Sequence, residues 1–126
     1  MSRVLIMDDE IIIRNAAGRV LSRMGHDVQY ASHGAEVIAL YQMAHESQRA
    51  FDVVILDLII RAGMGGQEAF AHLRKIDPHV KAIVSSGSTT DPAVLEYANH
   101  GFRAVLVKPY GKRELAAALQ KVLEKS

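Results

Sequence analysis

The sequence contains no cysteine among its 126 residues. This absence excludes disulfide bonds and metal sites built from thiolates, and it is compatible with a reducing compartment. Long hydrophobic runs are also missing. The amino-terminal segment has a run of only four apolar residues, Val4 to Met7, before the acids begin, which is too short for a signal peptide or a membrane-spanning helix. We therefore expect a cytoplasmic protein that makes no use of a membrane.

The chain also lacks an excess of charge of either sign. Lysine and arginine total 15 against 14 acidic residues, so the formal net charge is +1. Such a balance does not produce the strong positive field that nucleic acids or anionic membrane surfaces attract. We expect neither nucleic acid nor a membrane as a partner of this chain.

What is present is a moderately long, apolar and non-repetitive sequence. Hydrophobic residues make up 49% of the 126 positions, enough for one compact domain that buries most of the surface its unfolded chain exposes. A second folded domain has no room, so the predicted domain spans residues 1–126.

Short apolar runs alternate with segments of helical periodicity. An apolar run closed by acids, such as Val53 to Leu56 between Asp52 and Asp57, is typical of a strand buried on both faces of a parallel sheet. The alternation predicts a doubly wound α/β domain with right-handed crossovers. The expected strands are 4–7, 28–31, 53–56, 82–84 and 104–107, and the expected helices are 13–24, 35–46, 67–76, 91–101 and one from about 112.

Charged or reactive side chains follow four of the five predicted strands: Asp8 and Asp9, then Asp57, Ser86 and Lys108. The ends of parallel strands share one edge of a sheet, where ligands bind in open α/β folds. Carboxylates gathered at separations of roughly 4 Å repel by several kcal/mol in a partly buried site. A cation must compensate, and carboxylate oxygens suit Mg²⁺, which keeps waters and accepts phosphate oxygens as further ligands.

With Mg²⁺ and Lys108 in place, this edge would suit a phosphoryl group. Asp57 is then the expected nucleophile, because a carboxylate is ionised at neutral pH and can form an aspartyl phosphate. The cations would neutralise the transferred oxygens, as phosphoryl transfer requires. Ser86 could donate a hydrogen bond to the product.

Four segments carry these residues: VLIMDDE at 4–10, DVVILDL at 52–58, AIVSSG at 82–87 and VLVKP at 105–109. Together, in this order and spacing, they resemble the receiver domain of two-component response regulators over essentially the whole chain. The resemblance implies a flavodoxin-like, doubly wound five-stranded parallel sheet in the order 2-1-3-4-5, with five helices. It implies a phosphoacceptor signalling domain rather than a metabolic enzyme.

The resemblance also implies roles for single residues. Asp57 would accept the phosphoryl group from the phosphohistidine of a sensor histidine kinase or phosphotransfer protein. Asp9, Asp57 and the backbone carbonyl of Ile59 would hold Mg²⁺, with Asp8 acting through water. Lys108 would contact the phosphoryl group, next to a cis peptide bond.

Several positions depart from the receiver pattern. Arg61 stands where proline is usual, Val105 where an aromatic commonly swings inward, and Tyr110 where phenylalanine usually follows Lys-Pro. The Gly-Met-Gly-Gly segment at 63–66 resembles receivers attached to hybrid sensor kinases, and its glycines allow positive φ and sharp turns. Val105 suggests weaker coupling between the phosphorylation site and the surface formed by the fourth helix, the fifth strand and the fifth helix. That coupling could instead run through another residue, such as Tyr110. A homodimer through the last helix and residues 98–107 is possible.

Three alternatives remain at this stage. A receiver-like module that binds partners without being phosphorylated would fit Val105 and the altered loop. A small Mg²⁺-dependent phosphohydrolase is disfavoured, because Ile59 occupies the place of its second acid and the chain has no length for a cap domain. A flavin binder is disfavoured, because Asp8, Asp9 and Glu10 would repel the phosphate of the cofactor.

Overall fold

Strands and helices alternate along the chain in the computed structural model, which describes residues 2–61 and 63–124. Within these ranges no helix combines the length and the apolar character needed to cross a bilayer. The elements are β1 Arg3–Met7, α1 Ile11–Arg23, β2 Asp27–Ala31, α2 Gly34–Glu46, β3 Val53–Asp57, α3 Gly66–Ile76, β4 Ala82–Ser86, α4 Pro92–Leu95, β5 Ala104–Val107 and α5 Lys112–Leu123.

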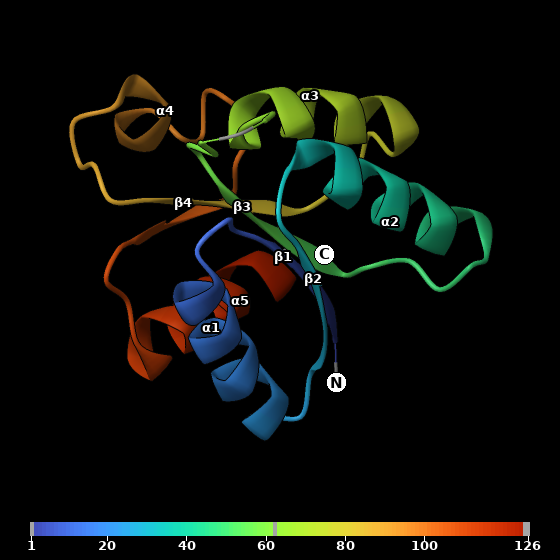
Figure 1. Ribbon diagram of the computed structural model, residues 1–126, viewed down its shortest axis with the longest axis horizontal. Helices are drawn as coiled ribbons and strands as arrows, with labels where there is room; N and C mark the ends of the chain where they lie inside the picture. The colour runs from blue at the N-terminus through green and yellow to red at the C-terminus, as the bar shows by residue number, and fades with distance from the viewer. Residues whose placement is uncertain (1, 62, 125–126) are drawn as a thin grey trace.

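The five strands form one parallel sheet in the order β2-β1-β3-β4-β5. Helices α1 and α5 cover one face of the sheet, and α2, α3 and α4 cover the other (Figure 1). Because both faces are covered, β3 and β4 are buried along their whole length, which explains the apolar runs 53–56 and 82–84 that form most of these strands. The predicted fold and strand order are confirmed.

Successive residues of β3 face opposite sides of the sheet. Val54 and Leu56 belong to the hydrophobic core under α2 and α3, whereas Val53 and Ile55 belong to the core under α1 and α5. Continuing this alternation, Asp57 points to the face that α1 and α5 cover. The strand therefore ends with a carboxylate on that side, at the carboxyl edge of the sheet.

Helix α4 is shorter than the sequence predicts. The expected helix over 91–101 begins with the predicted cap, in which the Asp91 side chain accepts a hydrogen bond from the Ala93 amide at 2.9 Å, but it ends at Leu95. Ala93 and Val94 are buried, whereas Leu95 is 66% exposed. Because little packing supports a further turn, the backbone leaves the helical region at Glu96.

Of the glycines before α3, Gly63 has a positive φ, whereas Gly65 and Gly66 serve another purpose. Gly65 has φ −84°, and Gly66 is the first residue of the helix, so neither adopts positive φ. Their role is close approach: a Cβ on Gly65 would lie 2.5 Å from the carbonyl oxygen of Leu58, and one on Gly66 would lie 2.6 Å from that of Asp57. The start of α3 is thus pressed against the end of β3.

Candidate functional site

The structure brings the predicted strand-end residues to one edge of the sheet. Asp8 follows β1, Asp57 and Ser86 are the last residues of β3 and β4, and Lys108 follows β5. The first three are buried, each exposing no more than 4% of its surface. Four polar residues at the ends of four strands therefore lie along one edge of the sheet, as expected for parallel strands.

Lys108 joins two of the carboxylates. Its Nζ donates to Asp57 Oδ2 at 2.9 Å and lies 2.9 Å from Asp8 Oδ2. The exposed side-chain fractions are 12% for the lysine, 2% for Asp8 and 6% for Asp57. Ion pairs with so little exposure to solvent are only weakly screened by salt. The ammonium group therefore holds the two carboxylates together. The peptide bond from Lys108 to Pro109 is cis, as the family resemblance implies.

Burial shifts the acidity of Asp57. Removal from water raises the pKa of this carboxyl to about 6, helped by the nearby Asp8 charge and opposed by Lys108 and the backbone N–H of Ile59. Burial alone would lower the pKa of Lys108, but its bonds to Asp8 and Asp57 outweigh burial and raise it. The lysine is therefore permanently charged, whereas Asp57 is mainly ionised at neutral pH.

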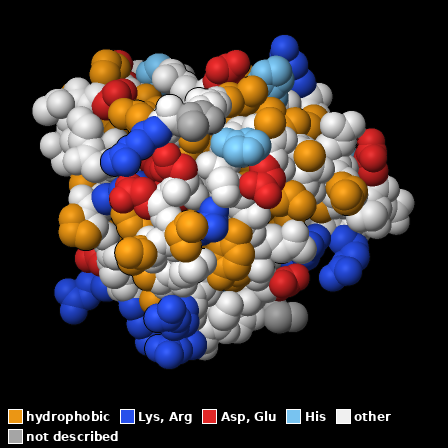
Figure 2. Space-filling model, viewed as in Figure 1, with side chains coloured by type: hydrophobic (Ala, Val, Ile, Leu, Met, Phe, Trp, Pro, Cys, Tyr) orange, Lys and Arg blue, Asp and Glu red, His pale blue; other side chains and the backbone are white. Residues whose placement is uncertain are grey.

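A second group of acids lies at the same edge. Asp8, Asp9 and Glu10 each place a carboxylate oxygen within 4.8 Å of the others. Backbone amides orient two of them: the Glu10 amide donates to Asp8 Oδ1 at 2.9 Å, and the Arg61 amide donates to Asp9 Oδ2 at 3.0 Å. This set of hard oxygen ligands fits a divalent cation such as Mg²⁺. Figure 2 shows acidic side chains gathered beside the start of α1, with hydrophobic side chains next to them.

Ser86 and Ile59 lie at this edge with different surroundings. The Ser86 hydroxyl accepts a hydrogen bond from the Ser88 amide at 3.0 Å, and the residue is buried. Ile59 is 63% exposed, and its backbone N–H acts on the Asp57 carboxylate. Arg61 reaches the site with its amide, while the residue itself is exposed.

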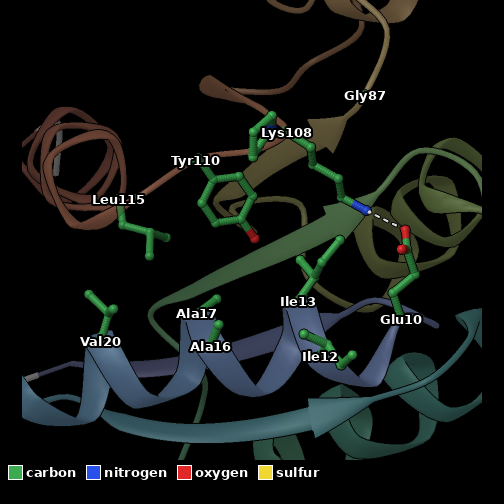
Figure 3. Close-up of a pocket in the computed structure, with 12 residues that line it drawn as sticks. Glu10, Ile12, Ile13, Ala16, Ala17, Val20, Gly87, Lys108, Tyr110 and Leu115 are labelled. Carbon is green, nitrogen blue, oxygen red and sulfur yellow. Dashed lines mark ion pairs between the residues drawn. The ribbon is translucent and has the colours of Figure 1, made fainter.

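Sequence reasoning missed two residues at the site. Glu10 was noted in the acidic run but given no role, yet its Oε1 lies 3.6 Å from Lys108 Nζ (Figure 3). Its place directly after Asp9 was the available signal. Ser85 is the register partner of Asp57 across β3 and β4. No signal in the sequence marks Ser85 over Ser86, because the pairing depends on strand register.

The comparison with protein families agrees with this geometry. The profile of the response regulator receiver domain matches residues 4–120. The chain belongs to the receiver domain family. Receiver domains are signalling domains that take part in phosphorelays with histidine kinases or phosphotransfer proteins.

Two relatives show that a receiver domain can make up nearly a whole protein or a small part of a longer one. The chemotaxis protein CheY of Thermotoga maritima is 31% identical over 121 residues, which cover 95% of this chain and 96% of that protein. The sensor kinase CckA of Brucella abortus is 29% identical over 122 residues, covering 97% of this chain and only 12% of that protein. The family thus includes proteins of about this length and much longer ones.

Solved structures show the same receiver fold. The chemotaxis response regulator CheY4 of Vibrio cholerae superposes with a TM-score of 0.79 at 31% identity, covering 98% of this chain and 99% of that one. A CheY-like receiver domain from Methanospirillum hungatei gives 0.85 at 24% identity, covering 99% and 95%. The second likeness concerns the fold alone.

Proposed function

We propose that this receiver domain accepts a phosphoryl group on Asp57 in a Mg²⁺-dependent reaction, with a phosphohistidine of a sensor histidine kinase or phosphotransfer protein as donor. One observation carries the proposal: a single ammonium group, on Lys108, lies 2.9 Å from the carboxylates of both Asp57 and Asp8. This arrangement keeps a buried carboxylate ionised and places a cation where phosphoryl oxygens would arrive.

The transfer follows from these positions. An oxygen of the Asp57 carboxylate attacks phosphorus, the new P–O bond forms, and the P–N bond to the donor imidazole breaks with the electron pair going to that nitrogen. Lys108 turns from the carboxylates to the transferred oxygens, and the Ser86 hydroxyl donates to one of them. A bound Mg²⁺ would neutralise charge on the carboxylates and the phosphoryl oxygens.

The ligands proposed for Mg²⁺ are Asp9, Asp57 and the Ile59 carbonyl, with Asp8 acting through water. The mutual proximity of Asp8, Asp9 and Glu10 supports the acidic part of this set. Glu10, being exposed, would contact the outer waters. The phosphorylated domain would then change its contacts with other proteins, including a second copy of itself.

Acetyl phosphate with Mg²⁺ tests the proposal without a cognate kinase. Intact mass spectrometry is expected to show a gain of one phosphoryl group that chelation of Mg²⁺ prevents and that Asp57→Asn abolishes. The matched control is Asp52→Asn, which changes an exposed acid at the other end of the same strand and should be labelled like the unaltered protein. A protein that binds partners but is never labelled would instead be a receiver-like interaction module.

A further inference from the structure

A hydrogen bond joins the loop after β1 to the loop after β3, at the sheet edge that carries Asp57. The backbone N–H of Arg61 donates to Oδ2 of Asp9 at 3.0 Å, across 52 positions of the sequence. Hydrogen bonds to an ionised acceptor are roughly twice as strong as those between neutral groups. A carboxylate has two oxygens, so Asp9 can keep this bond while it offers Oδ1 to a cation.

The segment that carries this amide is itself held in place. The Leu58 amide donates to the Ser85 carbonyl at 2.8 Å, and the Gly66 amide donates to the Leu58 carbonyl at 3.2 Å. Between these two anchors, Ile60 is only 8% exposed and belongs to the core under α2 and α3. Because this buried residue directly precedes Arg61, the core fixes where the amide lies. The amide therefore restrains the Asp9 carboxylate rather than following it.

The same segment carries the Ile59 carbonyl, which is proposed above as a ligand of Mg²⁺. This carbonyl and the Arg61 N–H belong to consecutive peptide units, because one lies in the bond from 59 to 60 and the other in the bond from 60 to 61. The hydrogen bond to Asp9 thus links two of the proposed ligands, one from each loop. The donor is a backbone group, so the exposed arginine side chain takes no part in it. Proline at this position would have no N–H to donate.

We propose that the Arg61 amide holds Asp9 against the Ile59 carbonyl and thereby makes the cation site select Mg²⁺ over Ca²⁺. Arg61 is a positioning residue, since it acts through Asp9 and touches no reacting atom. The inference rests on the function proposed above, from which it takes the two ligands. It concerns cation selectivity, which can be measured without any phosphoryl transfer.

The selectivity follows from the different demands of the two ions. Mg²⁺ is small and requires near-ideal octahedral coordination with short bonds, whereas Ca²⁺ accepts more oxygen ligands at longer and more variable distances. A carboxylate restrained by a fixed donor cannot move outward to make room for the larger ion. Without that donor Asp9 can rotate and the site can widen. Affinity for Mg²⁺ should then fall more than affinity for Ca²⁺.

Calorimetric titrations with Mg²⁺ and with Ca²⁺ test the proposal through the ratio of the two dissociation constants. Arg61→Pro, which removes the N–H, should weaken Mg²⁺ binding about tenfold and Ca²⁺ binding by no more than about threefold. Arg61→Ala keeps the N–H and should keep the ratio of the unaltered protein. A general disturbance of the site would weaken the binding of both ions alike and leave the ratio unchanged.

A second variant separates the loss of the N–H from strain, because proline also restricts the backbone of the residue before it. Lactic acid in place of residue 61 converts the peptide bond from 60 to 61 into an ester and otherwise matches Arg61→Ala. This ester variant lacks the N–H and should reproduce the change in the ratio. Thermal unfolding establishes that each variant is folded.

An ester variant that binds both ions as Arg61→Ala does would overturn the positioning role of Arg61. Equal losses for the two ions, or an unaltered protein that does not prefer Mg²⁺, would overturn it as well. If acetyl phosphate still labels Asp57 in such a protein, the proposed function stands and only the positioning role is lost. A protein that shows the expected ratios but is never labelled would refute the phosphoacceptor function and leave the positioning role supported.

Discussion

At the scale of single residues, Lys108 holds together two buried carboxylates that would otherwise repel each other. Both contacts are 2.9 Å. Removing one partner of a buried ion pair typically costs about 3 to 5 kcal/mol, because it leaves uncompensated charge in a dry environment. The stability of the site without metal therefore depends strongly on this one side chain.

Lys108→Met is expected to lower the free energy of unfolding by about 3 kcal/mol in metal-free buffer, and Mg²⁺ should restore part of that loss. Urea denaturation with and without chelator measures both effects. The control is Lys112→Met, which changes an exposed lysine at the start of α5 and should stay within about 0.5 kcal/mol of the unaltered protein. Equal losses in the two variants would contradict the proposed role.

The raised pKa of Asp57 gives Mg²⁺ binding a pH dependence. Burial raises this pKa to about 6, so below that value a proton must leave before a cation binds. Affinity should therefore fall by about tenfold per pH unit as the pH drops below about 6 and level off above it. Calorimetric titrations across this range measure it. Asp57→Asn should show no inflection there, and an inflection near the ordinary value of 3.8 would refute the shift.

At the scale of elements, the start of α3 determines how the end of β3 is held. Gly66→Ala would place a Cβ 2.6 Å from the Asp57 carbonyl oxygen and 3.3 Å from Leu56 Cβ. Overpacking costs about 1 to 3 kcal/mol, which exceeds the gain of about 1 kcal/mol in helix propensity. The variant should lose stability in urea and accept phosphoryl more slowly. Gly87→Ala, where a Cβ would meet nothing within 4 Å, should do neither.

A hydrogen bond joins α2 to the end of α3: the Tyr41 hydroxyl donates to Asp77 Oδ2 at 2.9 Å. Burial would raise the pKa of Asp77, but the His79 amide and Tyr41 outweigh it and lower the pKa. A carboxylate with a lowered pKa stabilises the fold above its ordinary pKa, and that stability is lost as the pH falls through the lower, folded value. The hydrogen bond between Tyr41 and Asp77 should therefore stabilise the fold at neutral pH and lose this effect in strong acid.

Tyr41→Phe is accordingly expected to cost about 1 kcal/mol of unfolding free energy at neutral pH and less in strong acid. Urea denaturation at both pH values measures the difference. Tyr30→Phe, on the edge strand β2, is the control and should stay within about 0.5 kcal/mol of the unaltered protein. A loss in Tyr41→Phe that does not depend on pH would show that packing, rather than the bond to Asp77, is responsible.

At the scale of the whole molecule, the acids at the sheet edge make folding depend on divalent cations. A ligand that binds only the folded state stabilises it by about 2.7 kcal/mol at a hundred times its Kd. Mg²⁺ should therefore raise the unfolding temperature progressively, and Asp9→Asn should reduce the gain. Sodium chloride at equal ionic strength should not reproduce it. An equal effect of sodium chloride would mean that general screening, not a site, is responsible.

Much of this architecture could be predicted from the order of residues. Apolar runs that end in Asp57 or Lys108 indicate parallel strands, and parallel strands bring their ends to one edge, so the contact between these two residues follows. The length of α4 could not be predicted, because it depends on tertiary packing: Val94 is buried in the core, whereas Leu95, the next residue, is exposed. The close contact of Gly65 and Gly66 with the end of β3 could not be predicted for a similar reason: the approach of α3 to this strand is visible only in three dimensions.

The sequence by itself determined the fold, the strand order through a recognisable family pattern, and the acids and the lysine that meet at the sheet edge. The fold class and the shared edge follow from periodicity and chain direction, which are local properties, whereas the strand order follows from the family resemblance. Only the tertiary structure decided that Ser85 lies opposite Asp57 and that Glu10 reaches Lys108. Such contacts depend on strand register and helix packing, where a shift of one residue exchanges the two faces of a strand.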